Sequence, residues 1–395
     1  MKLEGYASLL RDRKVIADTL ARRKGARSDP ARLYHWEAGQ TRRAVDRIHP
    51  EHLRWRVALV REETPTTRTL VLMPLAGPVP AFLPGQYLNV LVDIGGVRTS
   101  RPQSISSSPT QLGSLELTVR AKAHGFVSHY LVRELRAGDE LTTSGPEGDF
   151  SFNPARDQEQ MLLIAGGSGI TPFVGMAEYL LGRHPTARIT LLYGSYAADD
   201  IIFKERIEQL ARQYGPRFCP AFVVSGPAPD WLGERGFIDR GFIERHAPHV
   251  AQAKTSVFVC GPRPMQDSVL RALAALGVVR SKVQVETSGF ADDAAELEGW
   301  PSGLGTSTVF SAKLTGRDEP IPTQAGELLI NSLERAGVKV PALCRSGVCG
   351  TCRSKLVGGK VFTDPSVPSR PSDRTAGYIL LCSSYPLSDV DLGAH

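Results

Sequence analysis

The sequence has no long apolar run. Nowhere in its 395 residues does a stretch approach the roughly 20 apolar residues that a membrane-spanning helix requires. Its first residues hold only a short apolar run, Tyr6–Leu10, with charges on both sides, whereas a secretory signal peptide needs a longer apolar core. We therefore expect a soluble protein with no membrane span and no secretory signal.

Cysteine is scarce. The chain has six cysteines, and two of them, Cys219 and Cys260, lie far apart in the sequence. Such a small number argues against the disulfide framework of a secreted protein. We therefore expect a reducing compartment, the cytoplasm.

The other four cysteines are grouped near the C-terminus. Cys344, Cys349 and Cys352 follow the spacing C-x4-C-x2-C, and Cys382 is a distant fourth. This is the plant-type arrangement of a 2Fe-2S cluster, whose irons take soft thiolate ligands. A zinc ribbon or unrelated buried cysteines are the alternatives, but zinc sites favour two short-spaced pairs, and here three ligands share one loop. The spacing therefore predicts an electron carrier.

Acidic residues are few at the N-terminus. Residues 1–50 hold twelve Lys and Arg against six Asp and Glu, a balance equal to the +6 of the whole chain. Apolar residues at helical spacing from Leu9 to Leu20, followed by a break at Pro30, predict a basic, partly helical arm. A basic arm can touch nucleic acid or an anionic membrane, but interleaved aromatics are lacking. We favour a solvated helix that packs on the protein or on a partner.

From residue 51 to 155 the pattern is that of an antiparallel β-barrel. Short alternating apolar runs begin at Trp55 and are separated by Gly and Pro turns. Arg101 offers a bidentate guanidinium to a phosphate, and the turn from Gly125 to Ser128 opens a helix whose free N–H groups suit a pyrophosphate. Alone, each motif is explained by a solvated side chain or a helix cap. Together they predict a nucleotide site. The three motifs of this region are Arg101–Ser106, Gly125–Leu131 and Gly145–Phe150.

Between 156 and 290 the pattern changes to apolar strands followed by helices. The run Met161–Ala165 leads into the turn Gly166–Pro172 and a helix, and a later unit ends in Cys260-Gly261-Pro262 before a helix that contains Met265. We predict an α/β doubly wound parallel sheet with a dinucleotide at the helix start. Because the glycine pattern is not G-x-G-x-x-G, a purely structural βα turn is the alternative.

The last third of the chain divides into a linker and a small domain. Residues 291–307 are acidic and then rich in Gly, Ser and Pro, which is typical of a linker. Residues 308–395 carry a strand, a helix and the cysteine loop, as expected of an α+β, β-grasp-like ferredoxin domain. A linker of this length would let that domain swing.

These motifs, taken in order, resemble the ferredoxin–NADP reductase-like flavoproteins, and specifically the oxygenase reductase components that end in a plant-type ferredoxin. The resemblance covers residues 51–395. Residues 101–104 are similar to the family's Arg-x-Tyr-Ser flavin motif, 125–128 to its Gly-x-x-Ser FAD motif, 166–172 to its nicotinamide motif and 260–262 to its Cys-Gly motif.

The resemblance implies roles for individual residues. Ser104 is expected near flavin N5, Arg101 on the flavin phosphates and Cys260 near the nicotinamide. Glu286 matches the family's acidic residue near the flavin, and Phe290 the aromatic that screens the flavin face. Ser104, Cys260 and Glu286 form the implied catalytic set. The further cofactor-binding residues that it implies are Gln103, Ile105, Gly125, Phe126, Val127, Ser128, Gly166, Gly167, Gly169, Ile170, Thr171, Pro172, Gly261, Pro262 and Met265.

The flavin motif departs from the family at one position, where Gln103 replaces the usual tyrosine. Tyrosine would supply a stacking face for the isoalloxazine, whereas an amide offers hydrogen bonds alone. We therefore expect an altered flavin affinity.

The implied function is electron transfer from NAD(P)H through FAD to the 2Fe-2S cluster and on to a terminal oxygenase, hydroxylase or desaturase. Nicotinamide delivers two electrons at once and the cluster accepts one, so flavin must stand between them.

Asp199 and Asp200 follow the second strand of the nicotinamide domain, a position where a 2′-phosphate would need a basic partner, so we expect NADH to be favoured. The alternatives are a reductase of a small acceptor such as a quinone, and a redox-responsive binding protein that uses the basic arm. We expect no nucleic-acid partner.

Overall fold

The computed structural model describes residues 52–122, 125–226, 230–251, 254–287, 293–365, 367 and 370–393. The basic arm expected over 1–50 and the aromatic residue Phe290 lie outside these ranges. Within them, no helix has the length and apolar character needed to cross a membrane.

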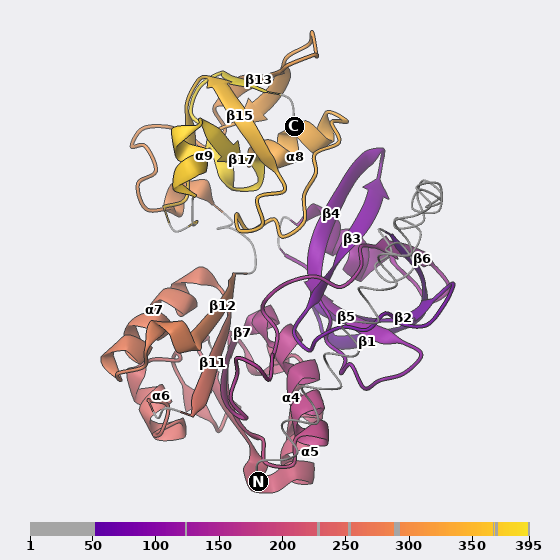
Figure 1. Cartoon of the computed structure of the whole chain (residues 1–395), viewed down its shortest axis with the longest axis vertical. Coiled ribbons are helices and arrows are strands. Elements are labelled where there is room, and N and C mark those ends of the chain that lie inside the picture. The colour runs from indigo at the N-terminus through magenta and orange to yellow at the C-terminus, as the bar shows by residue number, and fades with distance from the viewer. Residues whose placement is uncertain are drawn as a thin grey trace, which may run out of the picture. The chain divides into compact units, whose positions relative to one another are not determined.

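The first described domain is a curled antiparallel sheet in the order β4-β3-β6-β1-β2-β5 (Figure 1). Its edges meet where Ile105 bridges Leu117, so the sheet closes into the expected barrel. Trp55, Leu70 and Leu88 are fully buried inside it. The strands are β1 (Leu53–Thr64), β2 (Thr67–Pro74), β3 (Tyr87–Ile94), β4 (Val97–Ser104), β5 (Leu115–Arg120) and β6 (Glu140–Thr143), and helix α3 (Phe126–His129) runs into a π-helical turn, Tyr130–Glu134.

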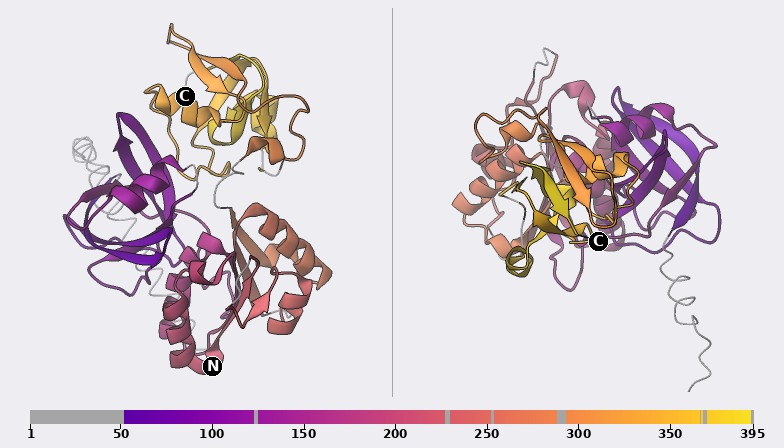
Figure 2. Two further views of the ribbon diagram at one scale, coloured as in Figure 1. Left: turned by 180° about the vertical axis from the view of Figure 1, so that it is seen from behind. Right: turned by 90° about the horizontal axis from the view of Figure 1, so that it is seen from above.

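The second domain is a parallel sheet in the order β10-β9-β8-β7-β11-β12. Helices α4 and α5 pack on one face through one apolar core, and α6 and α7 on the other through a second core (Figures 1 and 2). This confirms the doubly wound fold. The strands are β7 (Gln160–Gly166), β8 (Arg188–Ser195), β9 (Phe218–Val224), β10 (Glu234–Arg235), β11 (Thr255–Gly261) and β12 (Val283–Thr287), and the helices are α4 (Thr171–Arg183), α5 (Lys204–Tyr214), α6 (Arg240–His246) and α7 (Arg263–Ala275).

The third domain has a mixed sheet in the order β14-β13-β19-β15-β17 and a small sheet of β16 with β18. Helix α8 packs on the main sheet through Leu329, Ile330 and Leu333, in a core that includes Cys352 and Cys382. This is the expected α+β ferredoxin domain. Its elements are β13 (Val309–Leu314), β14 (Ile321–Gln324), α8 (Leu329–Arg335), β15 (Arg353–Gly358), β16 (Val361–Thr363), α9 (Pro371–Thr375), β17 (Tyr378–Leu380), β18 (Ser384–Pro386) and β19 (Val390–Leu392).

Part of the segment assigned to a linker is anchored on this third domain. Trp300 stands edge-on to Phe362 and Tyr385, with ring centroids 5.3 Å and 5.8 Å away. Its indole N–H donates to the carbonyl of Leu304 at 3.1 Å. The aromatic cluster therefore ties residues 300–304 to the ferredoxin domain.

Candidate redox site

The cysteine loop is shaped by its own backbone. N–H groups of Ser346 and Cys349 donate to the Cys344 sulfur at 3.4 Å and 3.3 Å, and that of Thr351 donates to the Cys349 sulfur at 3.5 Å. Gly347 and Gly350 adopt φ values of 77° and 80°, which side chains rarely tolerate. The loop is therefore built to surround sulfur atoms with N–H donors.

The four thiols form two pairs. Cys344 faces Cys349, and Cys352 faces Cys382. Within the part of the chain described, no three His, Cys, Asp or Glu residues converge on a point that would suit a single metal ion. Two pairs suit a 2Fe-2S cluster, in which each iron takes two thiolates, better than one tetrahedral zinc. The donor set therefore fits the cluster.

The first thiol of the loop is prepared for ligation. The hydrogen bond with Cys349, and then that with Ser346, lowers the pKa of Cys344 despite burial, whereas the same contact raises the pKa of Cys349. The thiolate is the form that binds metal. This loop therefore favours the ligating state of Cys344.

The flavin motif forms the end of β4. Ser104 is its last residue and pairs with Tyr87 on β3, whereas Gln103 pairs with Leu88. Ile105 is fully buried in the barrel core, and its N–H donates to the carbonyl of Gln86 at 2.8 Å. Ser104 and Gln103 are thus left partly accessible at the strand end.

Arg101 lies against the ferredoxin domain. Its guanidinium donates to the Thr99 hydroxyl and the Ser100 carbonyl, both at 2.7 Å, and reaches the Asn331 amide oxygen at 3.5 Å. Burial, and then repulsion by Arg345, lowers the pKa of Arg101 to about 10. The side chain expected on the flavin phosphates is thus already engaged by β4 and α8.

The pyrophosphate motif is a turn in which Gly125 lies close to the Ser128 side chain. A Cβ on Gly125 would lie 2.1 Å from the Ser128 hydroxyl, which accepts the Lys122 N–H at 3.1 Å. Val127 is buried in the barrel core, whereas Phe126 is 48% exposed. The turn at the start of α3 therefore offers an open backbone to a ligand, as a pyrophosphate site requires.

The two nicotinamide motifs meet at the carboxyl ends of neighbouring strands β7 and β11. A Cβ on Gly169 would lie 2.2 Å from the Cys260 carbonyl, and one on Gly166 would lie 2.5 Å from the Met265 sulfur and 2.9 Å from Pro262. The direction in which successive strands extend the sheet reverses between these two strands, which is where doubly wound sheets bind ligands. The other motif residues are Gly167, which adopts a φ of 52°, Ile170, Thr171 and Pro172 at the start of α4, and Gly261 at the end of β11.

The three implied catalytic residues lie together. The Cys260 sulfur is 3.8 Å from the Glu286 carboxylate, which is also hydrogen-bonded to Ser104. Burial raises the pKa of Glu286 to about 8, although the hydrogen bonds from Cys260 and Ser104 oppose the shift. Burial also raises the pKa of the Cys260 thiol. At neutral pH this site therefore holds an uncharged carboxylic acid that can donate a hydrogen bond.

Sequence reasoning missed two residues beside this group. The Gln266 amide donates to the carbonyls of Gly261 and Glu286, both at 2.8 Å, and thereby ties β11 to β12. Tyr87 has its pKa raised by burial and then by Glu147, Cys344, Cys349 and Glu286. Its place was readable in part, because a two-residue Gly95-Gly96 hairpin sets the register that pairs Tyr87 with Ser104.

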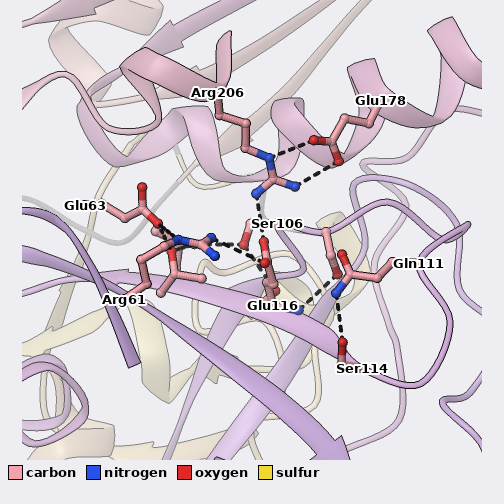
Figure 3. A network of polar contacts seen from close by, with 11 residues as sticks. Arg61, Glu63, Ser106, Gln111, Ser114, Glu116, Glu178 and Arg206 are labelled. Atoms are coloured by element: carbon pink, nitrogen blue, oxygen red, sulfur yellow. Dashed lines mark hydrogen bonds and ion pairs between the residues drawn. The ribbon is translucent and has the colours of Figure 1, made fainter. Parts of the chain in front are cut away.

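A partly buried chain of ion pairs joins the barrel to the nicotinamide domain (Figure 3). Arg206 on α5 donates to Glu178 on α4 at 2.7 Å and 2.8 Å and to Glu116 on β5 at 2.7 Å. Glu116 also accepts from Arg61 at 3.3 Å. Burial alone would lower the pKa of Arg206, but Glu178 and Glu116 outweigh it and the pKa lies above its usual value. A second pair, Arg120 with Asp200, crosses the same boundary.

Three family models match the chain in order. They are an oxidoreductase FAD-binding domain over residues 66–152, an oxidoreductase NAD-binding domain over 163–271 and a 2Fe-2S iron-sulfur cluster binding domain over 312–387. Their order agrees with that of the three domains described above, and each match lies within one of these domains.

Curated relatives match over nearly their full length. The chain is 30% identical to the NADH oxidoreductase HCR of Escherichia coli, with 86% of this chain and 97% of that protein covered. It is 31% identical to the ferredoxin reductase component of the 3-ketosteroid-9-alpha-monooxygenase of Mycolicibacterium smegmatis, with 85% and 95% covered.

Solved structures share the fold. Phthalate dioxygenase reductase matches with a TM-score of 0.66 at 21% identity, covering 87% of this chain and 98% of that one. The Amycolatopsis cytochrome P450 reductase GcoB matches with a TM-score of 0.54 at 31% identity, covering 61% and 71%.

Proposed function

The chain belongs to the ferredoxin–NADP reductase-like flavoproteins that end in a plant-type 2Fe-2S domain, and we propose that it supplies single electrons to a partner oxygenase. Its FAD-binding, NAD-binding and 2Fe-2S domains are the parts of a complete path from nicotinamide to cluster. When bound, nicotinamide and flavin supply the hydride chemistry, and the cluster carries one electron at a time. The observation that carries the proposal is the convergence of Ser104, Cys260 and Glu286 in a chain that also holds two facing pairs of cysteines.

The residues of the site divide the work between binding and protonation. Gly125–Ser128 would hold the FAD pyrophosphate, and Gly166–Pro172 the dinucleotide, through backbone N–H groups at helix starts. Ser104 and the protonated Glu286 are hydrogen-bonded to each other, which uses one of their two hydroxyl protons, and the other proton can be donated to a ring nitrogen that gains charge on reduction. Cys260, enclosed beside them, keeps water from the hydride path.

The compartment proposed is the cytoplasm. All six cysteines are unpaired with one another as disulfides, including the exposed Cys219. Thiols and cluster ligands of this kind persist in a reducing environment, which supports the assignment.

Steady-state reduction of one-electron acceptors tests the function. The holoprotein with NADH is expected to reduce ferricyanide and cytochrome c for many turnovers, and to support substrate oxidation by its partner oxygenase when the two are combined. Capture of that oxygenase by the intact protein would identify it. Turnover with a quinone but with neither one-electron acceptor would contradict the proposal and favour a small-acceptor reductase.

A further inference from the structure

The hydroxyl of Thr99, in the flavin-binding barrel, is hydrogen-bonded to residues of the ferredoxin domain. Thr99, in the middle of β4, is 7% exposed, and its side-chain oxygen donates to the Glu334 carboxylate at 2.8 Å. The same oxygen accepts from Arg345 at 3.1 Å and from Arg101 at 2.7 Å. A hydroxyl has one donor and two acceptor sites, so the hydrogen-bonding capacity of Thr99 is fully used.

These contacts lead directly to the cluster loop. Arg345 follows the cluster ligand Cys344, adopts a φ of 47° that is uncommon for a side-chain-bearing residue, and forms a buried ion pair with Glu334. Glu334 and Arg345 are 5% and 9% exposed. The Thr99 hydroxyl and the Arg345 side chain thus connect β4 to the residue that follows Cys344.

A purely internal role in the ferredoxin domain does not account for Thr99. Glu334 and Arg345 both belong to that domain and already neutralise each other. The barrel contributes a second guanidinium, that of Arg101. It also contributes the Thr99 hydroxyl, which accepts hydrogen bonds from both Arg101 and Arg345. Without that hydroxyl, two like charges would face one buried carboxylate, which is unfavourable in a site of low dielectric.

We propose that Thr99 is a positioning residue that holds the cluster loop against the flavin-binding strand and so sets the distance over which the electron moves. When bound, the flavin would supply electrons one at a time and the cluster would accept one, and the contacts of Thr99 would hold the loop of Cys344 and Arg345 at a fixed place beside β4. This inference rests on the proposed function, because it concerns the same internal transfer.

Three variants of the holoprotein test it. Thr99→Val keeps the β-branched shape that suits a strand but removes the hydroxyl, and Thr99→Ser keeps the hydroxyl. Arg335→Gln is the matched control, because Arg335 also lies on α8 and its ion pair with Glu327 is exposed and internal to the ferredoxin domain. Rapid mixing with NADH would follow flavin bleaching and cluster reduction separately, the latter by electron paramagnetic resonance of frozen samples. Hydrogen exchange of the α8 amides gives a readout independent of turnover.

The expected result is a split between the two rates. In Thr99→Val, NADH is expected to reduce the flavin at the wild-type rate, whereas the cluster is expected to be reduced about tenfold more slowly. A displacement of about 1 Å can slow a reaction by that factor or more. It also exchanges α8 amides faster, whereas Thr99→Ser and Arg335→Gln behave as wild type. Wild-type cluster reduction and exchange in Thr99→Val would overturn the inference. A wild-type protein whose cluster is not reduced by NADH would instead overturn the proposed function.

A fourth variant, Asn331→Ala, tests the inference if Thr99→Val does not retain flavin. Asn331→Ala removes the α8 partner of Arg101 from the ferredoxin side and leaves the barrel unchanged. It is expected to slow cluster reduction in the same direction by a smaller factor. An unchanged rate in Asn331→Ala, with Thr99→Val unable to bind flavin, would count against a positioning role for this contact.

Discussion

Glu286 connects a single carboxyl group to the pH dependence of the whole protein. Burial raises its pKa from 4.5 to about 8, so the folded state prefers the protonated form. The stabilisation is present in full below the unfolded pKa of 4.5 and is lost as the pH rises through about 8. Raising the pH from 4.5 to about 8 therefore makes the folded protein hold the ionised form of Glu286 in a site that disfavours it.

The first prediction is that Glu286→Gln flattens this dependence. Between about pH 7 and pH 9, the thermal unfolding midpoint of the wild type is expected to fall more than that of the variant. Differential scanning fluorimetry across matched buffers measures both. Parallel curves for the two proteins would show that Glu286 is already ionised at neutral pH.

A second residue-scale prediction concerns the cluster. Cys349→Ser removes one thiolate of the Cys344 and Cys349 pair, so the visible absorption and the reduced-state paramagnetic signal of the cluster are expected to disappear. NADH should still reduce the flavin, because the Ser104, Cys260 and Glu286 group lies in the other two domains. Simultaneous loss of flavin reduction would contradict the independence of the two centres.

The residues of the site differ in how far sequence could predict them. Cys344, Cys349, Cys352 and Cys382 were identified from spacing, which is a local signal. Thr99 was not, because its partners in the ferredoxin domain are more than 230 positions away in the chain and the motif that begins at Arg101 does not include it. Contacts of that kind depend on how domains pack, and a strand motif does not encode them.

At the scale of single elements, the turn before α3 makes a prediction about flavin binding. Gly125→Ala would place a methyl group 2.1 Å from the Ser128 hydroxyl, so FAD retention during gel filtration is expected to fall. Gly182→Ala, at the exposed C-terminal end of α4, where the nearest atom that an added Cβ would meet is the Tyr214 hydroxyl at 3.9 Å, is the control and should retain FAD. The flavin extracted from the wild type with acid should be FAD, and recovery of FMN would refute the assignment of this turn.

The end of β8 bears on coenzyme choice. Asp200 is paired with Arg120 of the barrel, so its charge is largely neutralised, which the sequence did not indicate. Asp199 remains exposed, and Lys204, the next base along the chain, lies 5.9 Å over the Trp231 ring. A 2′-phosphate bound at this position would therefore lie near the carboxylate of Asp199 and near a lysine that already contacts Trp231.

A preference for NADH is the expected outcome. Comparing kcat/KM for NADH and NADPH at one ionic strength measures it, since the ratio reports transition-state binding. A tenfold preference for NADPH, which corresponds to about 1.4 kcal/mol, would show that another basic group reaches the 2′-phosphate.

For the molecule as a whole, the Arg206 chain is expected to hold two domains together. Arg206→Met leaves Glu178 without this cation and Glu116 with Arg61 alone, and should cost about 2 kcal/mol, as expected for the loss of hydrogen bonds between charged groups. Arg240→Met breaks an exposed pair with Glu244 and should cost under about 0.5 kcal/mol. Urea denaturation of both variants compares them, and equal costs would mean that the Arg206 chain is no stronger than a surface pair.

The three folded domains each contain a tryptophan with a bonded indole N–H: Trp55 in the barrel, Trp231 in the nicotinamide domain and Trp300 beside the ferredoxin sheet. The chain has one more, Trp36, outside the described residues. Substituting phenylalanine for three of the four would leave a single tryptophan at a known position. Emission from each such protein would then report the melting of one domain in isolation, and its quenching by flavin would report how near that domain stays to the chromophore.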